Sequence, residues 1–182
     1  MKKIVAAVLL SATVAAPAFA ADEGFYAGIT LGSGKPNVTP GAAVVNKTSN
    51  FIYGGVAGYQ YNKNLATEVQ FTGVGKATDV AGNSLKGDAL SLSVVGMLPL
   101  GDSFELLGKL GVASAKTTAS GATAYQGASR TGLTYGFGAQ YNVSQNLGLR
   151  LGYDRYAVAT SNAGVKINGN ANVMTVGAVY KF

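Results

Sequence analysis

The chain lacks the residue types on which most enzyme active sites depend. Its 182 residues include no histidine and no cysteine, so the commonest general base, the usual transition-metal ligand and the thiolate nucleophile are all missing. Acid–base chemistry would have to come from its eight Asp and Glu residues. Asp79 and Asp88 lie close together, but the sequence places no nucleophile or orienting partner beside them. We therefore expect no catalysis, no metal site and no cofactor.

Three charged residues could instead form ion pairs, because each stands alone in a largely apolar segment. Glu68 lies in Ala66-Thr67-Glu68-Val69, Lys109 in Gly108-Lys109-Leu110-Gly111, and Arg150 in Leu149-Arg150-Leu151. A charge that is removed from water needs an opposite charge and hydrogen bonds to offset its desolvation. Whether these three side chains meet depends on the secondary structure that carries them.

The first 20 residues have the features of a secretory signal peptide. Lys2-Lys3 precedes an apolar run from Ile4 to about Ala15, and the segment ends in the small-residue pattern Ala18-Phe19-Ala20. The run is shorter than the roughly 18 to 20 apolar residues of a membrane-spanning helix. We predict a signal peptide over residues 1–20 that is cleaved after Ala20, and a single domain over residues 21–182.

The charge of residues 21–182 is modest. Because Lys2 and Lys3 leave with the signal peptide, 12 Lys and Arg residues remain against 8 Asp and Glu residues. This small excess is spread thinly and forms no basic patch of the kind that binds nucleic acid. We expect no nucleic-acid partner.

Alternation of apolar and polar residues with a period of two recurs in eight segments and predicts β-strands. The segments are Gly24–Gly32, Asn50–Tyr61, Leu65–Val74, Asp88–Leu98, Phe104–Ala115, Thr131–Val143, Leu147–Ala157 and Ala171–Phe182. No stretch after the signal peptide reaches 18 apolar residues, so a membrane crossing would be made by strands of about 9 to 11 residues. An even number of strands is typical of bacterial barrels that have both termini on one side.

The predicted connections alternate between short and long. The short ones are Asn62–Asn64, Gly101–Ser103 and Ser144–Asn146, and the long ones are about Ser33–Ser49, Ala77–Gly87, Lys116–Arg130 and Val158–Asn170. Outer-membrane barrels combine short periplasmic turns with longer external loops. We therefore predict an all-β fold, an eight-stranded antiparallel up-and-down transmembrane β-barrel of the bacterial outer membrane, with its short turns in the periplasm.

The two faces of the predicted strands differ in polarity. The outward face is apolar and includes Phe51, Tyr53, Ala57, Tyr59, Tyr61, Leu90, Leu92, Val94, Leu98, Met174, Val176, Ala178, Tyr180 and Phe182. Aromatic residues gather near the strand ends, which suits the boundary between lipid tails and headgroups. A soluble barrel would place its polar residues on this face, so the pattern favours contact with lipid.

The inward face carries the polar residues. They are Glu68, Gln70, Lys109, Gln140, Arg150 and Asp154. Counted from the periplasmic end, Glu68 and Arg150 are the fourth residues of their predicted strands and Lys109 is the sixth, so the three lie at similar depth. Side chains fill the lumen of an eight-stranded barrel. We predict that Glu68, Lys109 and Arg150 form a charge cluster across the lumen.

Short motifs along residues 21–182 resemble the transmembrane domain of the outer membrane protein A family. They are Gly58-Tyr59-Gln60-Tyr61-Asn62, Leu98-Pro99-Leu100, Gly108-Lys109-Leu110-Gly111, Gly138-Ala139-Gln140-Tyr141, Leu149-Arg150-Leu151-Gly152-Tyr153 and Val179-Tyr180-Lys181-Phe182. The resemblance implies that Glu68 and Arg150 form a gate in a narrow water path, with Lys109 at a basic position of the fifth strand. Val95 and Gln140 stand where the family has a lysine and a glutamate, so these partners for an ion-pair switch are missing.

The same resemblance bears on the end of the chain. It implies that Tyr180 and Phe182 are the assembly signal that the barrel-assembly machinery reads. No segment here corresponds to the family's peptidoglycan-binding domain, so we expect no tethering to the cell wall.

Two functions remain open from the sequence. The first is a structural or porin-like barrel with at most a narrow ion path, gated by Glu68, Lys109, Arg150 and Gln140. The alternative is an adhesin or host-surface interaction protein that acts through its four external loops, where Tyr125 and Arg130 are the conspicuous residues. Barrel enzymes that act on lipid A or surface proteins rely on histidine, so catalysis is not expected. The expected partners are outer-membrane lipid, lipopolysaccharide and the barrel-assembly machinery, with the chain a monomer.

Overall fold

The structure, a computed structural model, describes most of the chain after the predicted signal peptide. The described residues are 23–37, 47–48, 51–78, 84–120, 125–126, 128–162 and 165–182. The predicted signal peptide lies outside them, as do Asp79 and parts of all four predicted long connections. Among the residues described, no helix is long and apolar enough to cross a membrane.

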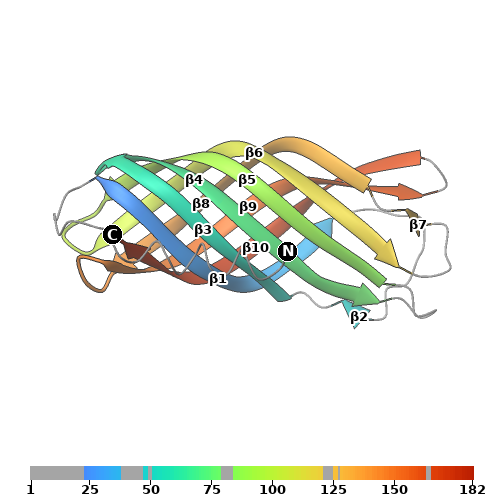
Figure 1. Cartoon of the computed structure of the whole chain (residues 1–182), viewed down its shortest axis with the longest axis horizontal. Helices are drawn as coiled ribbons and strands as arrows, with labels where there is room; N and C mark the ends of the chain where they lie inside the picture. Colours follow the sequence, from blue (N-terminus) through green and yellow to red (C-terminus); the bar gives the residue numbers. More distant parts are fainter. Residues whose placement is uncertain are drawn as a thin grey trace.

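Eight long antiparallel strands form the wall of a barrel (Figure 1). They are β1 (Gly24–Asn37), β3 (Phe51–Asn62), β4 (Leu65–Thr78), β5 (Ser84–Pro99), β6 (Phe104–Ser120), β8 (Ala128–Asn142), β9 (Leu147–Asn162) and β10 (Val165–Lys181). Two short strands, β2 (Lys47–Thr48) and β7 (Tyr125–Gln126), pair with β4 and β9. The predicted fold class is confirmed.

The barrel is closed by the pairing of its first and last strands. β1 and β10 are antiparallel and in register from Tyr26 opposite Lys181 to Asn37 opposite Asn170. Closure leaves the long strands without a free edge, so their backbone N–H and C=O groups are paired within the sheet. A sheet that faces lipid requires this, because the bilayer core offers no water to unpaired backbone groups.

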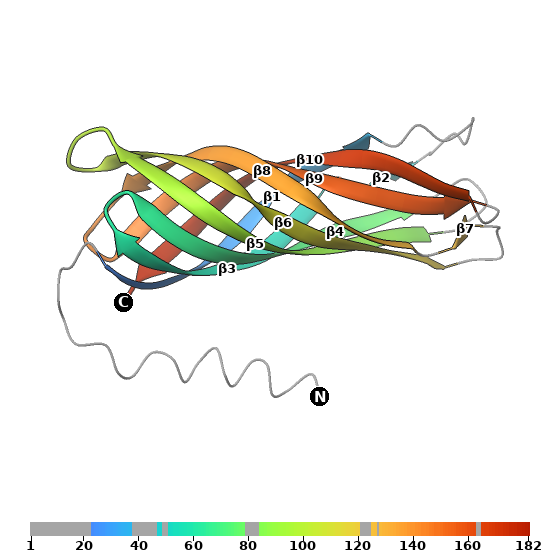
Figure 2. The same ribbon diagram turned by 90° about the horizontal axis from the view of Figure 1, so that it is seen from above.

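The three short turns lie where they were predicted, at one end of the barrel (Figure 2). At the first, the Asn64 backbone N–H donates to Asn62 Oδ1 (2.8 Å), and at the third, the Leu147 N–H donates to Ser144 Oγ (3.1 Å). At the second, the Leu100 N–H donates to the Phe104 carbonyl (2.7 Å), and Gly101 adopts a φ of 105° that favours glycine. Local turn chemistry therefore fixes these connections.

At the opposite end the strands are longer than predicted. β1 continues to Asn37 instead of Gly32, β6 to Ser120 instead of Ala115, and β10 begins at Val165 instead of Ala171. The predicted long connections were therefore too long. The prediction was wrong there because the apolar alternation ends where the outward face leaves the lipid, whereas backbone pairing continues into water.

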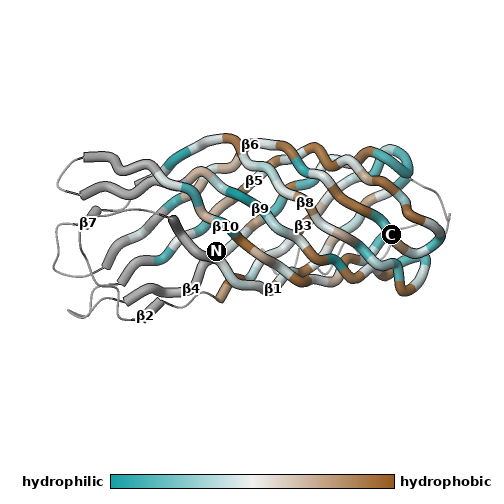
Figure 3. Tube along the Cα trace, turned by 180° about the vertical axis from the view of Figure 1, so that it is seen from behind, coloured by the Kyte–Doolittle hydropathy of each residue, from teal (hydrophilic) through white to brown (hydrophobic). Residues whose placement is uncertain are grey.

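The outward and inward faces are as predicted. Leu92, Val94, Met174 and Val176 are exposed on the outer wall, as is most of the predicted outward set. Figure 3 shows apolar residues around the barrel wall in the half that contains the C-terminus. This belt is the surface that meets lipid.

Inside the barrel, two apolar clusters are separated by a polar layer. The cluster toward the short turns comprises Tyr26, Val56, Ala66, Val95, Met97, Leu107 and Val179. The cluster toward the other end comprises Ile52, Ala89, Ala113, Ala115, Tyr156 and Val173. On β5 the inward positions run from Ala89 through buried Ser91 and Ser93 to Val95. The polar layer at this middle depth contains the candidate site.

Candidate functional site

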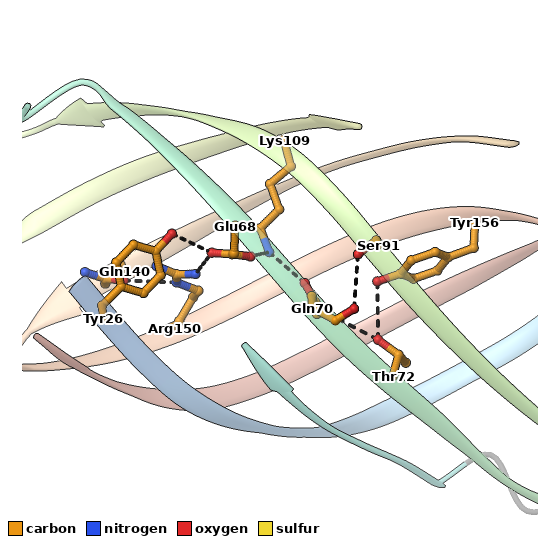
Figure 4. Close-up of polar contacts among 9 residues, drawn as sticks. All are labelled: Tyr26, Glu68, Gln70, Thr72, Ser91, Lys109, Gln140, Arg150 and Tyr156. Carbon is orange, nitrogen blue, oxygen red and sulfur yellow. Dashed lines mark hydrogen bonds and ion pairs between the residues drawn. The ribbon is translucent and has the colours of Figure 1, made fainter. Parts of the chain in front are cut away.

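Glu68 is the centre of the polar layer, and it accepts hydrogen bonds from three strands (Figure 4). Its side chain is 1% exposed. Lys109 Nζ donates to Oε1 at 2.6 Å, while Arg150 Nη1 and the Tyr26 hydroxyl donate to Oε2 at 2.5 and 2.9 Å. The structure thus brings together all three charged residues of the predicted cluster, from β4, β6 and β9.

Tyr26 reaches Glu68 because a glycine lies between them. Tyr26, Gly58 and Glu68 are register partners on the neighbouring strands β1, β3 and β4. A Cβ at Gly58 would lie 2.4 Å from Tyr26 Cζ, so any other residue there would collide with the ring. The ring also lies under the Arg150 guanidinium, whose Cζ is 5.4 Å from the ring centroid, within the range of a cation–π contact.

Amide side chains support the two cations. Lys109 Nζ donates a second hydrogen bond to Gln70 Oε1 at 3.0 Å, and Arg150 Nε donates to Gln140 Oε1 at 3.0 Å. Gln140, a predicted member of the cluster, therefore holds Arg150 in place and does not itself touch Glu68 in these contacts. This network reduces the cost of burying the charges, since it pairs donors that would otherwise be unsatisfied.

From Gln140 the hydrogen bonds continue toward the short turns. Gln140 Nε2 donates to Asn142 Oδ1 at 2.8 Å, and Asn142 Nδ2 donates to Glu105 Oε1 at 2.8 Å. Glu105, Gln140 and Arg150 are register partners on β6, β8 and β9. An unbroken chain of polar contacts therefore runs from Glu68 to the mouth of the barrel.

Sequence reasoning missed three members of this network. Tyr26, Asn142 and Glu105 all lie on the inward face, and their alternation phase could have placed them there. Phase alone does not say which inward side chains extend across the lumen to a partner. Their roles follow from the register and from the glycines beside them.

Asp154, predicted to face inward, is buried on β9. Its Oδ2 is fully buried and has no hydrogen-bond partner among the described residues. Nearby, the Tyr156 and Thr72 hydroxyls are 3.4 Å apart, and Gln70 Nε2 donates to Thr72 Oγ1 at 3.5 Å. Among the described residues, the polar layer thus contains one buried carboxylate oxygen outside its hydrogen-bond network.

The arrangement supports closure of the lumen by charge pairing. In the described ranges no three His, Cys, Asp or Glu side chains are grouped so that they could hold a metal ion. Breaking a buried ion pair by removing one partner typically costs about 3 to 5 kcal/mol. This cost reflects the buried charge that is left without a partner, so Glu68, Lys109 and Arg150 depend on one another at this depth.

The predicted assembly residues lie at the end of the wall. Tyr180 is exposed on the outer face, and its ring meets that of Phe182 edge to face with centroids 5.3 Å apart. The Phe182 backbone N–H donates to the Phe25 carbonyl at 3.0 Å. The terminal aromatic residue is therefore attached to β1, the strand that closes the barrel.

Comparison with solved structures finds the same fold in outer-membrane proteins of other bacteria. Neisserial surface protein A matches with a TM-score of 0.67 and 17% identity, over 87% of this chain and 97% of that chain. OprG from Pseudomonas aeruginosa matches with a TM-score of 0.63 and 15% identity, over 89% and 97%. Ail from Yersinia pestis, in complex with the heparin analogue sucrose octasulfate, matches with a TM-score of 0.58 and 18% identity, over 87% and 99%. At these identities the likeness concerns the fold.

Comparison with curated proteins finds no match. The family model of the outer membrane protein beta-barrel domain matches residues 5–182, which is nearly the whole chain. This match and the solved barrels confirm the predicted resemblance and the predicted location. The chain therefore belongs to the outer membrane protein beta-barrel domain family, and it is a β-barrel protein of the bacterial outer membrane.

Proposed function

We propose that this protein is a structural barrel whose lumen is closed at rest by Glu68, Lys109 and Arg150, and that it passes small ions only when these contacts open. The observation that carries the proposal is the position of Glu68. Its carboxylate is almost completely buried and accepts hydrogen bonds from two cations and one phenol, each on a different strand. These contacts tie opposite sides of the lumen together at one depth.

The layers above and below support the same function. Val95, Met97 and Leu107 lie in the lumen toward the short turns, beside the polar contacts that end at Glu105. Ile52, Ala113 and Tyr156 lie in it toward the other end. Apolar constrictions oppose the entry of ions because they do not replace the hydration shell. A wide, permanently water-filled pore does not fit this lumen, so conduction would be rare and of small amplitude.

Single-channel recording in planar bilayers tests the proposal. The wild-type protein is expected to remain closed most of the time, with brief openings of small conductance. Glu68→Ala leaves Lys109 and Arg150 without their shared partner, so its openings should be at least several times more frequent. The variant's fold is checked first by heat-modifiable gel mobility, since a folded barrel migrates differently before and after boiling.

The matched control is Glu23→Ala, which removes an exposed carboxylate just before β1. Its traces should equal those of the wild type. If folded Glu68→Ala and wild type both give no reproducible openings, the ion path does not exist and the barrel is purely structural.

We further propose that lipopolysaccharide is the lipid partner of the outer rim. Lys86 on β5 and Lys116 on β6 are exposed on the outward face, beyond the apolar positions Leu90 and Val112. Lys116 is the register partner of Asp88. Lys86, Lys116 and Asp88 together therefore carry a net positive charge. Lipid phosphates carry the complementary charge. Replacing both lysines by Gln should reduce the lipopolysaccharide that copurifies with the barrel, and unchanged copurification would count against this role.

The alternative function, binding of a host or surface ligand through the external loops, is favoured by one relative. Ail is a solved barrel in complex with a heparin analogue. The same exposed pair, Lys86 and Lys116, gives this chain cationic groups at the end away from the short turns. Retention on heparin of the barrel in nanodiscs, lost in the Lys86→Gln/Lys116→Gln variant, would support this function. Absence of retention at low salt would exclude polyanion binding.

A further inference from the structure

The acidic and basic side chains in the middle of the described lumen are equal in number but unequally paired. Two carboxylates, Glu68 and Asp154, lie at this depth with two cations, Lys109 and Arg150. Both cations bond to Glu68, while Asp154 Oδ2 is buried without a hydrogen-bond partner among the described residues. A buried, unpaired carboxylate oxygen is costly, because nothing in its surroundings replaces the lost water.

Lys109 lies between the two carboxylates. Glu68 is on β4, two strands from β6 on one side, and Asp154 is on β9, two strands from β6 on the other. The Lys109 side chain already spans a two-strand separation, since its Nζ is 2.6 Å from Glu68 Oε1. Asp154 is in better register than Glu68, because Lys109, Gly136 and Asp154 are direct partners on β6, β8 and β9.

Gly136 keeps the route between Lys109 and Asp154 open. A Cβ at this position would lie 2.2 Å from Asp154 Oδ1, so the carboxylate occupies the space of the missing side chain and leans over β8. β8 is the strand that separates Asp154 from Lys109. The glycine therefore lets the Asp154 carboxylate extend toward the Lys109 ammonium.

The same device is seen elsewhere in the barrel with its bond formed. Tyr26 lies across Gly58 and donates to Glu68, two strands away, at 2.9 Å. Asp154, Gly136 and Lys109 repeat this arrangement of a long polar side chain, a glycine and an opposite partner in one row. In the row of Asp154, Gly136 and Lys109 the corresponding bond is not formed, because Lys109 bonds to Glu68 instead.

We propose that Asp154 is a second partner for the Lys109 ammonium, so that Lys109 moves between Glu68 and Asp154. In the second arrangement Glu68 keeps Arg150 and Asp154 gains Lys109, so each carboxylate has one cation. The role of this exchange in opening the lumen rests on the proposed function. Asp154 is the place to which Lys109 moves when the contacts of Glu68 with Lys109 and Arg150 loosen. Asp154 is then a positioning residue that acts through Lys109.

Pairwise coupling between Lys109 and Asp154, measured by urea unfolding in lipid vesicles, tests the exchange. All four proteins of the cycle carry Glu68→Gln. The first has no other substitution, the second adds Lys109→Met, the third adds Asp154→Asn, and the fourth adds both. With Glu68 neutral, Lys109 should bond to Asp154, and the unfolding equilibrium constants should show a coupling of roughly fivefold or more. The same cycle with Glu68 intact should give a smaller coupling, because Lys109 is then held by Glu68.

Two glycine variants make the test specific. Gly136→Ala in the Glu68→Gln background should abolish the coupling, because its Cβ takes the space of Asp154 Oδ1. Gly108→Ala is the matched control, since a Cβ there meets nothing within 4 Å, and it should leave the coupling unchanged. If Glu68→Gln does not fold, Glu68→Ala, which also removes the charge, takes its place in the cycle.

Independent effects of Lys109→Met and Asp154→Asn in the folded Glu68 variant would overturn the proposal. So would a coupling that survives Gly136→Ala. Neither readout involves current, so failure of the ion path in bilayers and failure of this exchange are separate results.

Discussion

Glu68 organises the lumen because it is the one acceptor shared by Tyr26, Lys109 and Arg150 in the network described above. A buried carboxylate with several donors is sensitive to the loss of any one of them. Loss of Lys109 would leave Oε1 buried without this donor, whereas Oε2 has two donors and would keep one if either Tyr26 or Arg150 were removed. The side chains around Glu68 should therefore contribute unequally when they are replaced one at a time.

Tyr26→Phe isolates one of these donors without changing the shape of the ring. It removes the 2.9 Å hydrogen bond to Glu68 and leaves the ring in position under Arg150. We expect the free energy of unfolding to fall by about 1.5 to 3 kcal/mol, the range for a hydrogen bond to a charged group. Urea unfolding in lipid vesicles measures it.

Tyr135→Phe is the comparison for that experiment. Tyr135 is exposed on the outer face, so its hydroxyl is not needed inside the barrel. Its replacement should change the unfolding free energy little, and an equal loss in both variants would contradict the role assigned to Tyr26.

The sequence predicts the site residues whose position follows from one strand alone, and it does not predict contacts that depend on a neighbouring strand. Glu68, Lys109 and Arg150 could be placed inward and at similar depth from alternation and from their distance to the short turns. Tyr26 could not be assigned to Glu68, because its reach depends on Gly58 in the neighbouring strand. Lys109 is bonded to Glu68 and not to its direct register partner across Gly136, and no count along one strand distinguishes these choices.

At the scale of the strands, a glycine on the intervening strand gives Tyr26 the space to reach Glu68. Gly58 is close-packed, since a Cβ would lie 2.4 Å from Tyr26 Cζ and 2.6 Å from the Thr67 carbonyl oxygen. The second neighbour is backbone and cannot turn away. Space at this position is therefore required for the bond between Tyr26 and Glu68.

Gly58→Ala should destabilise the barrel by about 1 to 3 kcal/mol, the usual cost of forcing extra atoms into a packed interior. Gly108→Ala adds the same methyl group where nothing lies within 4 Å, and it should be tolerated. Unfolding free energies of the two variants decide the matter. Equal stability of both would mean that the wall relaxes easily and that Gly58 has no special part.

Strand ends divide into those that the sequence predicts and those that it does not. The three short turns are set by local residues such as Asn62, Gly101 and Ser144, and they lie where expected. The far ends of β1, β6 and β10 extend beyond the predicted limits. Outside the lipid belt either face of a hairpin can meet water, so polarity no longer alternates although backbone pairing continues.

We propose that Phe182 and Tyr180 act in assembly more than in stability. Phe182 follows the last residue of β10. Among the described residues its ring makes one contact with another aromatic ring, edge to face with Tyr180. Phe182→Ala should reduce the amount of folded barrel in the outer membrane of cells severalfold. Refolding of the purified variant into vesicles should yield nearly wild-type stability. Equal losses in cells and in vitro would assign the residue a structural role instead.

At the scale of the whole molecule, the barrel combines an apolar outer belt with a lumen built in three layers. Lipid contact requires a closed wall, and the pairing of β1 with β10 supplies it. The two apolar layers and the polar layer between them fill the interior. Buried ion pairs are weak evidence for stability, because apolar residues of similar size often replace them at little cost. The function proposed above gives these ion pairs a role in opening the lumen, which filling alone would not require.

The direct test of this account is single-channel recording of a variant in which the charge cluster is replaced by apolar residues, Glu68→Leu/Lys109→Met/Arg150→Met. If the charged layer is the part that opens, this variant should fold, be about as stable as the wild type, and show none of the brief openings of the wild-type protein. Openings of equal frequency and conductance in the two proteins would contradict the account, because the ion path would then not depend on Glu68, Lys109 and Arg150.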